Sequence, residues 1–75
     1  MNTLDQIKSG DSAMIQKVSS GALACKLTEM GLYPGKEIKI LFKAPLGDPI
    51  AIEVGDYTLS LRKEEAASIE VTVGT

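Results

Sequence analysis

Short alternating runs of apolar residues constrain the fold of this chain more than any other feature. Every second residue is apolar in segments 37–43, 50–54 and 57–61, which is typical of strands with one buried face. Turn-forming residues separate the runs: KAPLGDP lies between the first two, and Gly55-Asp56, a pair suited to a tight hairpin turn, lies between the last two. The pattern predicts consecutive antiparallel strands. The side chains of the first run that we expect to be buried are Ile38, Ile40 and Phe42.

Two further runs complete the predicted strands. Residues 12–19 form one of them, and a bulge between Ile15 and Val18 would turn both of these side chains inward. Residues 69–73 alternate again and form the last strand. About five strands are therefore expected.

The apolar period changes between Ser20 and Gly31. Leu23, Leu27 and Met30 are spaced as i, i+4 and i+7, which places them on one face of a helix. Ser20 is a suitable N-cap, and Gly31 stands where a glycine commonly ends a helix. We expect one amphipathic helix whose apolar face packs on the core.

The expected architecture is a mainly β, SH3-like barrel of about five strands, with the helix inserted after the first strand. The 75 residues are expected to form a single domain, residues 1–75. A domain of this size has a thin core, and its one cysteine cannot form a disulfide within the chain. The thin core and the barrel edges favour self-association into a homo-oligomer.

The segment KAPLGDP is predicted to be a stiff loop. Pro45 and Pro49 restrict the residues that precede them and donate no backbone hydrogen bonds, so they interrupt sheet pairing. Gly47 can adopt a left-handed conformation, and Asp48 can bond the nearby backbone. Leu46 is then held near the tip. The loop is either a rigid connector or a preorganised contact surface, and these interpretations are compatible.

A second candidate contact follows the helix. Leu32, Tyr33 and Pro34 lie in a turn marked by Pro-Gly, where large apolar residues are less expected. They either cover the end of the barrel or form an exposed contact. The candidate partner-binding residues are therefore Leu32, Tyr33, Pro34, Leu46, Gly47 and Asp48.

Composition argues against several functional classes. The net charge of −2 and the 4% aromatic content do not favour nucleic-acid binding, which needs basic and stacking surfaces. The chain has no histidine, no Ser or Cys with an evident activating partner, and no phosphate-binding glycine loop. We therefore expect a protein that is not an enzyme and has no cofactor or dedicated metal site. Cys25 is expected to be a small, partly buried apolar residue.

The cellular setting is also constrained. No stretch approaches the roughly 20 apolar residues of a membrane span, so we expect no direct membrane insertion. A lone cysteine and the absence of a signal-like start favour the cytoplasm.

Three segments together resemble the FeoA family over essentially the whole chain. They are KLTEMGLYPGKEIKIL, KAPLGDPIAIEV and LSLRKEEAASIEV, with the patterns L-x-x-M-G-L-x-P-G, A-P-x-G-D-P and L-x-L-R-x-x-E-A in that order. Each pattern alone is weak, whereas the combination is specific. The resemblance implies a small cytosolic SH3-like barrel associated with bacterial ferrous iron uptake.

The resemblance also implies a partner, the membrane ferrous iron transporter FeoB, which has a cytosolic GTP-binding domain. We expect the chain to bind the cytosolic part of FeoB, to modulate its transport or GTPase activity, and to be recruited by it to the inner face of the membrane. The alternative is a small transition-metal-binding or metal-sensing domain, similar to the SH3-like C-terminal domain of metal-dependent repressors. That alternative requires ligands to converge, such as Cys25, Asp48, Asp56 or Glu53.

Overall fold

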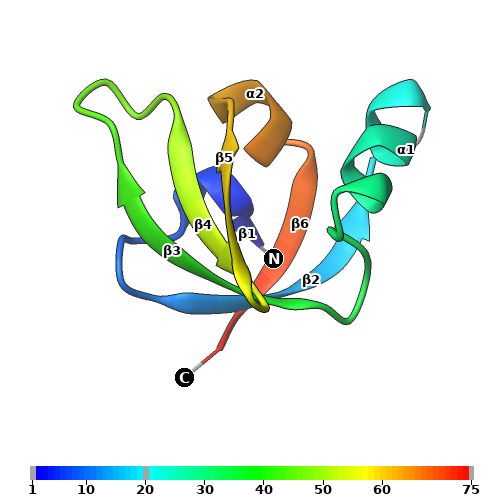
Figure 1. Ribbon diagram of the computed structural model, residues 1–75, viewed down its shortest axis with the longest axis horizontal. Coiled ribbons are helices and arrows are strands. Elements are labelled where there is room, and N and C mark those ends of the chain that lie inside the picture. The colour runs from blue at the N-terminus through cyan, green and yellow to red at the C-terminus, as the bar shows by residue number, and fades with distance from the viewer. Residues whose placement is uncertain (1, 20, 75) are drawn as a thin grey trace.

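The computed structural model describes residues 2–19 and 21–74, which form a strongly bent antiparallel sheet with short helical segments beside it (Figure 1). In chain order the elements are β1 (Asn2–Thr3), the 3-10 helix η1 (Leu4–Gln6), β2 (Ser12–Val18), α1 (Ala22–Glu29), β3 (Glu37–Lys43), β4 (Ile50–Val54), β5 (Tyr57–Leu61), α2 (Lys63–Ala66) and β6 (Ile69–Gly74).

Within the described residues, six strands pair in the order β1-β6-β2-β3-β4-β5, and every neighbouring pair is antiparallel. The five predicted strands are all present, and the two-residue strand β1 is an addition. Helix α1 follows β2, as expected for a helix inserted after the first long strand. The β4–β5 hairpin joins Val54 to Tyr57 through two residues, with Gly55 at a φ of +58°, so the predicted glycine-first turn is confirmed.

The core is built from apolar side chains of both the strands and the helical segments. Burying a large aliphatic side chain contributes about 1.5–3 kcal/mol, so these groups are a main source of the stability of the fold. The largest fully buried side chains are Leu4, Ile15, Leu27, Leu32, Ile38, Ile40, Ile50, Ile52, Val54, Leu61, Ile69 and Val71.

Two bulges bend the sheet. The pairing of β2 with β6 shifts register between Ile15 and Lys17, which confirms the predicted bulge and leaves Ile15 buried. The pairing of β3 with β4 shifts between Ile40 and Phe42, and this second bulge was not predicted. Because it interrupts the alternation of faces, Phe42 is 59% exposed, and its predicted burial is wrong.

The way in which α1 ends corrects the prediction that Leu32 is a partner-binding residue. Ser20, the predicted cap, lies outside the described residues, and Gly21 occupies the N-cap position. At the other end, Gly31 has a φ of +93° and donates its N–H to the carbonyl of Thr28, while the N–H of Leu32 bonds the carbonyl of Leu27. This is the Schellman arrangement, in which the apolar residue after the glycine packs back on the helix. Leu32 is accordingly fully buried and presents no contact surface.

Candidate partner-binding surface

The β3–β4 loop is closed by two backbone hydrogen bonds. The N–H of Ala44 donates to the carbonyl of Pro49 at 3.0 Å, and the N–H of Gly47 donates to the carbonyl of Ala44 at 2.7 Å. Gly47 has a φ of +81°, a conformation that favours glycine. Leu46 lies at the tip of the loop and is 90% exposed. The predicted stiff loop with Leu46 at its tip is therefore present.

The two charged residues of segment 41–49 anchor this loop to the rest of the molecule. Asp48 accepts a hydrogen bond at 3.0 Å from the backbone N–H of Lys63, the first residue of α2. Lys43 donates through Nζ to the backbone carbonyl of Asp5, in η1, at 2.8 Å. Asp48 therefore satisfies one of the free N–H groups at the start of α2, which is a structural role.

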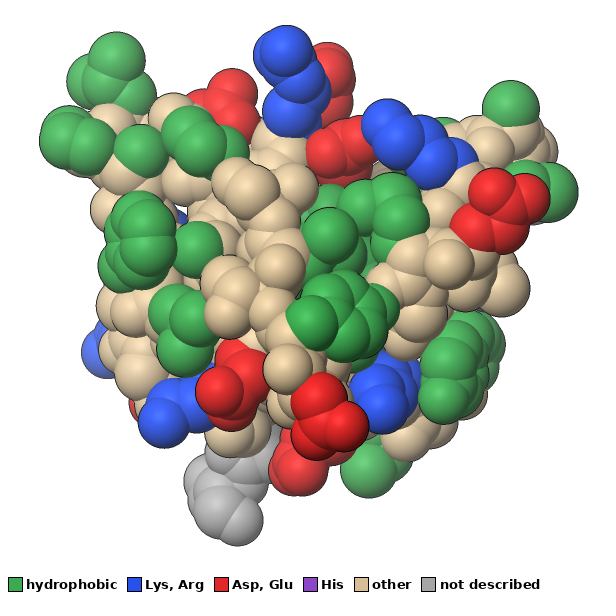
Figure 2. Space-filling view, viewed as in Figure 1, with side chains coloured by type: hydrophobic (Ala, Val, Ile, Leu, Met, Phe, Trp, Pro, Cys, Tyr) green, Lys and Arg blue, Asp and Glu red, His purple; other side chains and the backbone are tan. Residues whose placement is uncertain are grey.

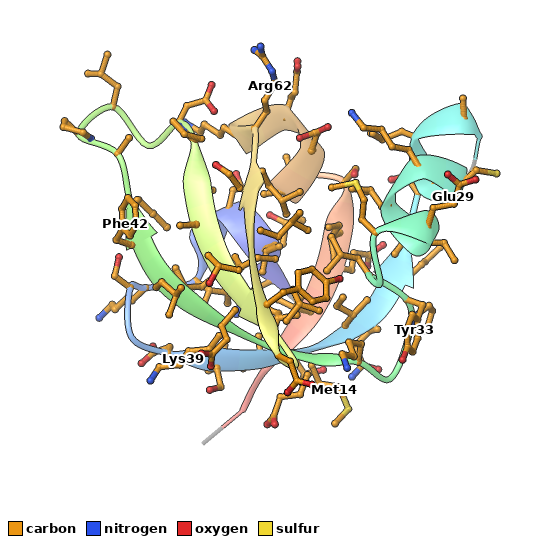
Figure 3. The ribbon with its side chains drawn as sticks, viewed as in Figure 1. Met14, Glu29, Tyr33, Lys39, Phe42 and Arg62 are labelled. Carbon is orange, nitrogen blue, oxygen red and sulfur yellow. The ribbon has the colours of Figure 1, made fainter. Side chains whose placement is uncertain are left out.

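The opposite side of the loop is apolar. Phe42, Pro45 and Leu46 are exposed there, and we call these three residues the loop patch. Figure 2 shows hydrophobic side chains gathered over this corner of the molecule, and Figure 3 places Phe42 directly below the loop. Because exposed apolar groups of this size are costly to hydrate, their grouping marks a candidate interaction site.

The second candidate contact lies elsewhere on the surface. Tyr33 is 43% exposed and begins a turn with Pro34 and Gly35, closed by a bond from the N–H of Lys36 to the carbonyl of Tyr33 at 3.1 Å. The N–H of Gly35 also donates to the carbonyl of Ile15, so β2 holds this turn. Figure 3 places Tyr33 beside α1 and Phe42 on the far side of the sheet. The structure therefore separates the predicted residues into two surfaces.

Exposed aromatic residues outside the prediction have different roles. Tyr57 is 45% exposed, but its hydroxyl donates to the carbonyl of Met30 at the end of α1. This hydrogen bond therefore holds α1 against β5. Phe42 has a side chain without polar groups and is 59% exposed. The period-two pattern in the sequence could not have identified it as a contact residue, because the pattern predicts burial.

The strongest electrostatic feature joins the two α-helices. Glu65 in α2 is mostly buried, and its Oε2 accepts a bond from Nζ of Lys26 in α1 at 3.0 Å. Its Oε1 accepts the backbone N–H of Arg62 at 2.8 Å. The Arg62 N–H, and after it the Lys26 ammonium, hold the pKa of the Glu65 carboxyl below its ordinary value of 4.5. This arrangement stabilises the fold and is not the mark of a catalytic acid.

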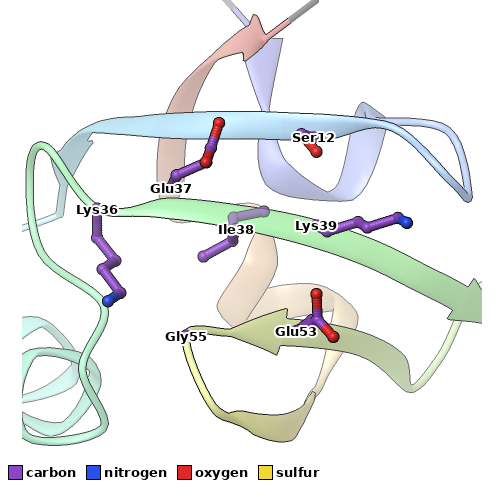
Figure 4. Close-up of a pocket in the computed structure, with 7 residues that line it drawn as sticks. All are labelled: Ser12, Lys36, Glu37, Ile38, Lys39, Glu53 and Gly55. Carbon is purple, nitrogen blue, oxygen red and sulfur yellow. The ribbon is translucent and has the colours of Figure 1, made fainter.

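One hollow on the surface carries mixed charges. It has a volume of about 320 Å³, lies where β3 passes between β2 and β4, and is lined by Ser12, Lys36, Glu37, Ile38, Lys39, Glu53 and Gly55 (Figure 4). Lys39 stands opposite Ser12 on one neighbouring strand and opposite Glu53 on the other. Such cross-strand pairs are typical of a solvated sheet face.

Metal-ligating side chains do not gather in the part of the chain that the structure describes. No three His, Cys, Asp or Glu residues within 2–19 and 21–74 are placed to hold a common ion. Cys25 is exposed on α1, which differs from its predicted partial burial. The convergence of Cys25, Asp48, Asp56 and Glu53 that the metal-handling alternative requires is therefore not found among these residues. The described helices also include none that is long and apolar enough to span a membrane.

The family model for the FeoA domain matches residues 2–73 of this sequence. The chain belongs to the FeoA family. This is an accessory family of ferrous iron transport, and the resemblance drawn from the three sequence segments is thereby confirmed.

Two similar proteins are a fusion that contains FeoB and a FeoA of known structure. A fusion of Fe(2+) transport protein A with the Fe(2+) transporter FeoB, from Porphyromonas gingivalis (strain ATCC BAA-308 / W83), is 42% identical over 69 residues. The match covers 91% of this chain and 8% of the fusion protein, so this chain spans a small part of that relative. The zinc complex of FeoA from Stenotrophomonas maltophilia is 30% identical, with a TM-score of 0.83 over 96% of this chain and 91% of that one. It is described as a prokaryotic SH3 domain protein, which confirms the SH3-like fold here.

The fold also occurs outside the FeoA family. A manganese-dependent transcriptional repressor is 16% identical, with a TM-score of 0.89 over 97% of this chain and 41% of the repressor. At that identity the likeness concerns the fold alone.

Proposed function

We propose that this FeoA-family chain is a non-enzymatic accessory protein that binds the cytosolic part of an FeoB-type ferrous iron transporter and modulates its transport or GTPase activity. In this role it works in the cytoplasm and is held at the inner face of the membrane by its partner. The described surface fits such a role, because it offers an exposed apolar contact.

The observation that carries the proposal is the fused relative. There, a domain 42% identical to this chain is part of the same polypeptide as FeoB. A covalent link keeps two modules at a high effective concentration, on the order of millimolar for a short flexible linker. Such a link benefits two modules that act on each other, and a separate chain must obtain the same association through its own surface.

The proposal is tested by affinity capture from membranes. The tagged chain, added to detergent-solubilised membranes of its own organism, is expected to retain the full-length FeoB-type transporter. The purified transporter in lipid nanodiscs is then assayed for GTP hydrolysis and, in vesicles, for ferrous iron uptake. A change in either rate on addition of the chain is expected. Absence of both capture and rate change would refute the proposal.

A further inference from the structure

We infer that the transporter covers the loop patch, Phe42, Pro45 and Leu46, and that it does so by accepting the Leu46 side chain into an uncharged apolar cleft. The inference rests on the proposed function and names the surface through which it acts. Tyr33 and Pro34, on the other candidate surface, lie outside this contact.

The shape of the loop favours insertion of one side chain. Leu46 is 90% exposed at the tip, and the bonds between Ala44 and Pro49 and between Gly47 and Ala44 hold the backbone that carries it. Order already present in the free protein lowers the entropy lost on binding. A convex apolar residue on a rigid loop requires a concave apolar partner.

The charges around the loop specify the chemistry of that partner. Lys43 and Asp48 are the charged residues of segment 41–49, and both are bonded to backbone groups on the η1 and α2 side. On the side of Phe42 and Leu46, segment 41–49 therefore presents apolar groups and no charged group of its own. A complementary surface is apolar and uncharged, because a charge buried against this patch would lose its hydration without gaining a partner.

The shape and charge of the patch, together with the fused relative, decide between occupants. A second copy of the chain is disfavoured, because a two-fold contact centred on this loop would set one convex apolar tip against another. Lipid binding is disfavoured because the loop lacks free Lys or Arg beside its apolar tip and the chain has a net charge of −2. The transporter is favoured because one relative carries a domain similar to this chain and FeoB in a single polypeptide. The loop patch is then the apolar centre of a wider contact, since a few buried residues carry most of the binding energy of an interface.

The test measures the affinity of the full chain for the full-length transporter in nanodiscs, with nanodiscs lacking the transporter as reference. Leu46→Ser and Phe42→Ser remove exposed side chains of the loop patch. Met14→Ser is the matched control, because Met14 is 43% exposed on β2 and lies away from the loop in Figure 3. We expect Leu46→Ser to weaken binding by about 10-fold or more, as for a Leu side chain that becomes buried. Met14→Ser should change the affinity by less than about 2-fold on the same scale.

The possible results distinguish failure of the proposed function from failure of this inference. Wild-type chain that does not bind the transporter overturns the proposed function and this inference with it. Wild-type binding that Leu46→Ser and Phe42→Ser leave unchanged overturns the inference alone. Equal Leu46-dependent binding to empty nanodiscs identifies a lipid contact, and a Leu46-dependent dimer in ultracentrifugation without an effect on transporter binding identifies a second copy. Either of these results also overturns the inference.

Discussion

Gly31 is the position at which one added methyl group should reveal how α1 is fastened to the barrel. The residue has a φ of +93°, and a Cβ built there collides with the hydroxyl of Tyr57. That hydroxyl donates to the carbonyl of Met30, the residue that caps α1. Gly31→Ala should therefore destabilise the fold in two ways, by straining the backbone at residue 31 and by breaking the Tyr57 hydrogen bond.

Gly35 separates these two effects. Its φ of +94° is nearly the same, but nothing lies within 4 Å of a Cβ built there. A left-handed conformation costs an L-residue about 1–2 kcal/mol, which is the whole expected cost of Gly35→Ala. Gly31→Ala should lose about 1 kcal/mol more, since the Tyr57 hydroxyl must move away from its acceptor. The total for Gly31→Ala is then about 2–3 kcal/mol.

The assay is urea and thermal unfolding of the two variants in the wild-type and Tyr57→Phe backgrounds. The additional 1 kcal/mol corresponds to a midpoint lower by about 4–8 °C for a domain of this size. In Tyr57→Phe the excess should vanish, because the Tyr57 ring carbon is at 3.6 Å from the added Cβ, an ordinary contact. Equal costs for Gly31→Ala and Gly35→Ala in the wild-type background would show that the Tyr57 hydroxyl does not contribute to the loss at Gly31.

Three further predictions concern the groups that hold the loop and the helices. Because the pKa of Glu65 is lowered in the folded state, its contribution to the free energy of unfolding is complete above the unfolded value near 4.5 and is lost as the pH falls through the folded pKa. Glu65→Gln should therefore flatten the dependence of stability on pH in that window. It should also lower the free energy of unfolding at neutral pH by about 1–2 kcal/mol, measured by urea titration at each pH. Asp48→Ala should cost about 1 kcal/mol by removing the bond to the start of α2, measured by chemical denaturation. Leu32→Ala should cost about 2–5 kcal/mol, as measured in the same way, whereas Tyr33→Ala should cost less than about 0.5 kcal/mol.

Matched substitutions sharpen these predictions. Lys26→Met removes the ion pair but keeps the Arg62 N–H bond, so it should reduce the acid-dependent stability less than Glu65→Gln does. Asp48→Asn keeps an oxygen acceptor and should restore most of the loss. Similar costs for Leu32→Ala and Tyr33→Ala would contradict the division between a buried and an exposed residue in this turn.

The sequence predicted features whose causes are local. The prolines and Gly47 restrict the backbone of their own segment, so the stiff loop and its exposed Leu46 followed from residue types alone. The same holds for the Gly55 hairpin and the turn at Pro34. Leu32 also had a local signal, since an apolar residue directly after a helix-ending glycine is typical of the Schellman arrangement. That signal favours burial, whereas the sequence analysis left both burial and an exposed contact open for Leu32.

Features that depend on distant partners could not be predicted. A bulge adds one residue to β3 relative to β4, and the alternation within β3 carries no record of it, so Phe42 was assigned to the wrong face. Asp48 bonds the N–H of Lys63, which is 15 residues away and becomes a neighbour only when the barrel closes. The separation of Tyr33 from the loop patch likewise follows from the path of the bent sheet.

Ferrous iron uptake in cells tests whether this chain supports the transporter through Leu46. A strain lacking this chain but retaining its FeoB-type transporter would be supplied with the wild-type chain, Leu46→Ser or Met14→Ser at equal abundance, and anaerobic uptake of labelled ferrous iron would be measured. We expect the wild type and Met14→Ser to restore uptake, whereas Leu46→Ser, although folded, does not. Full restoration by Leu46→Ser would contradict the role of the loop, and normal uptake without the chain would contradict the accessory function.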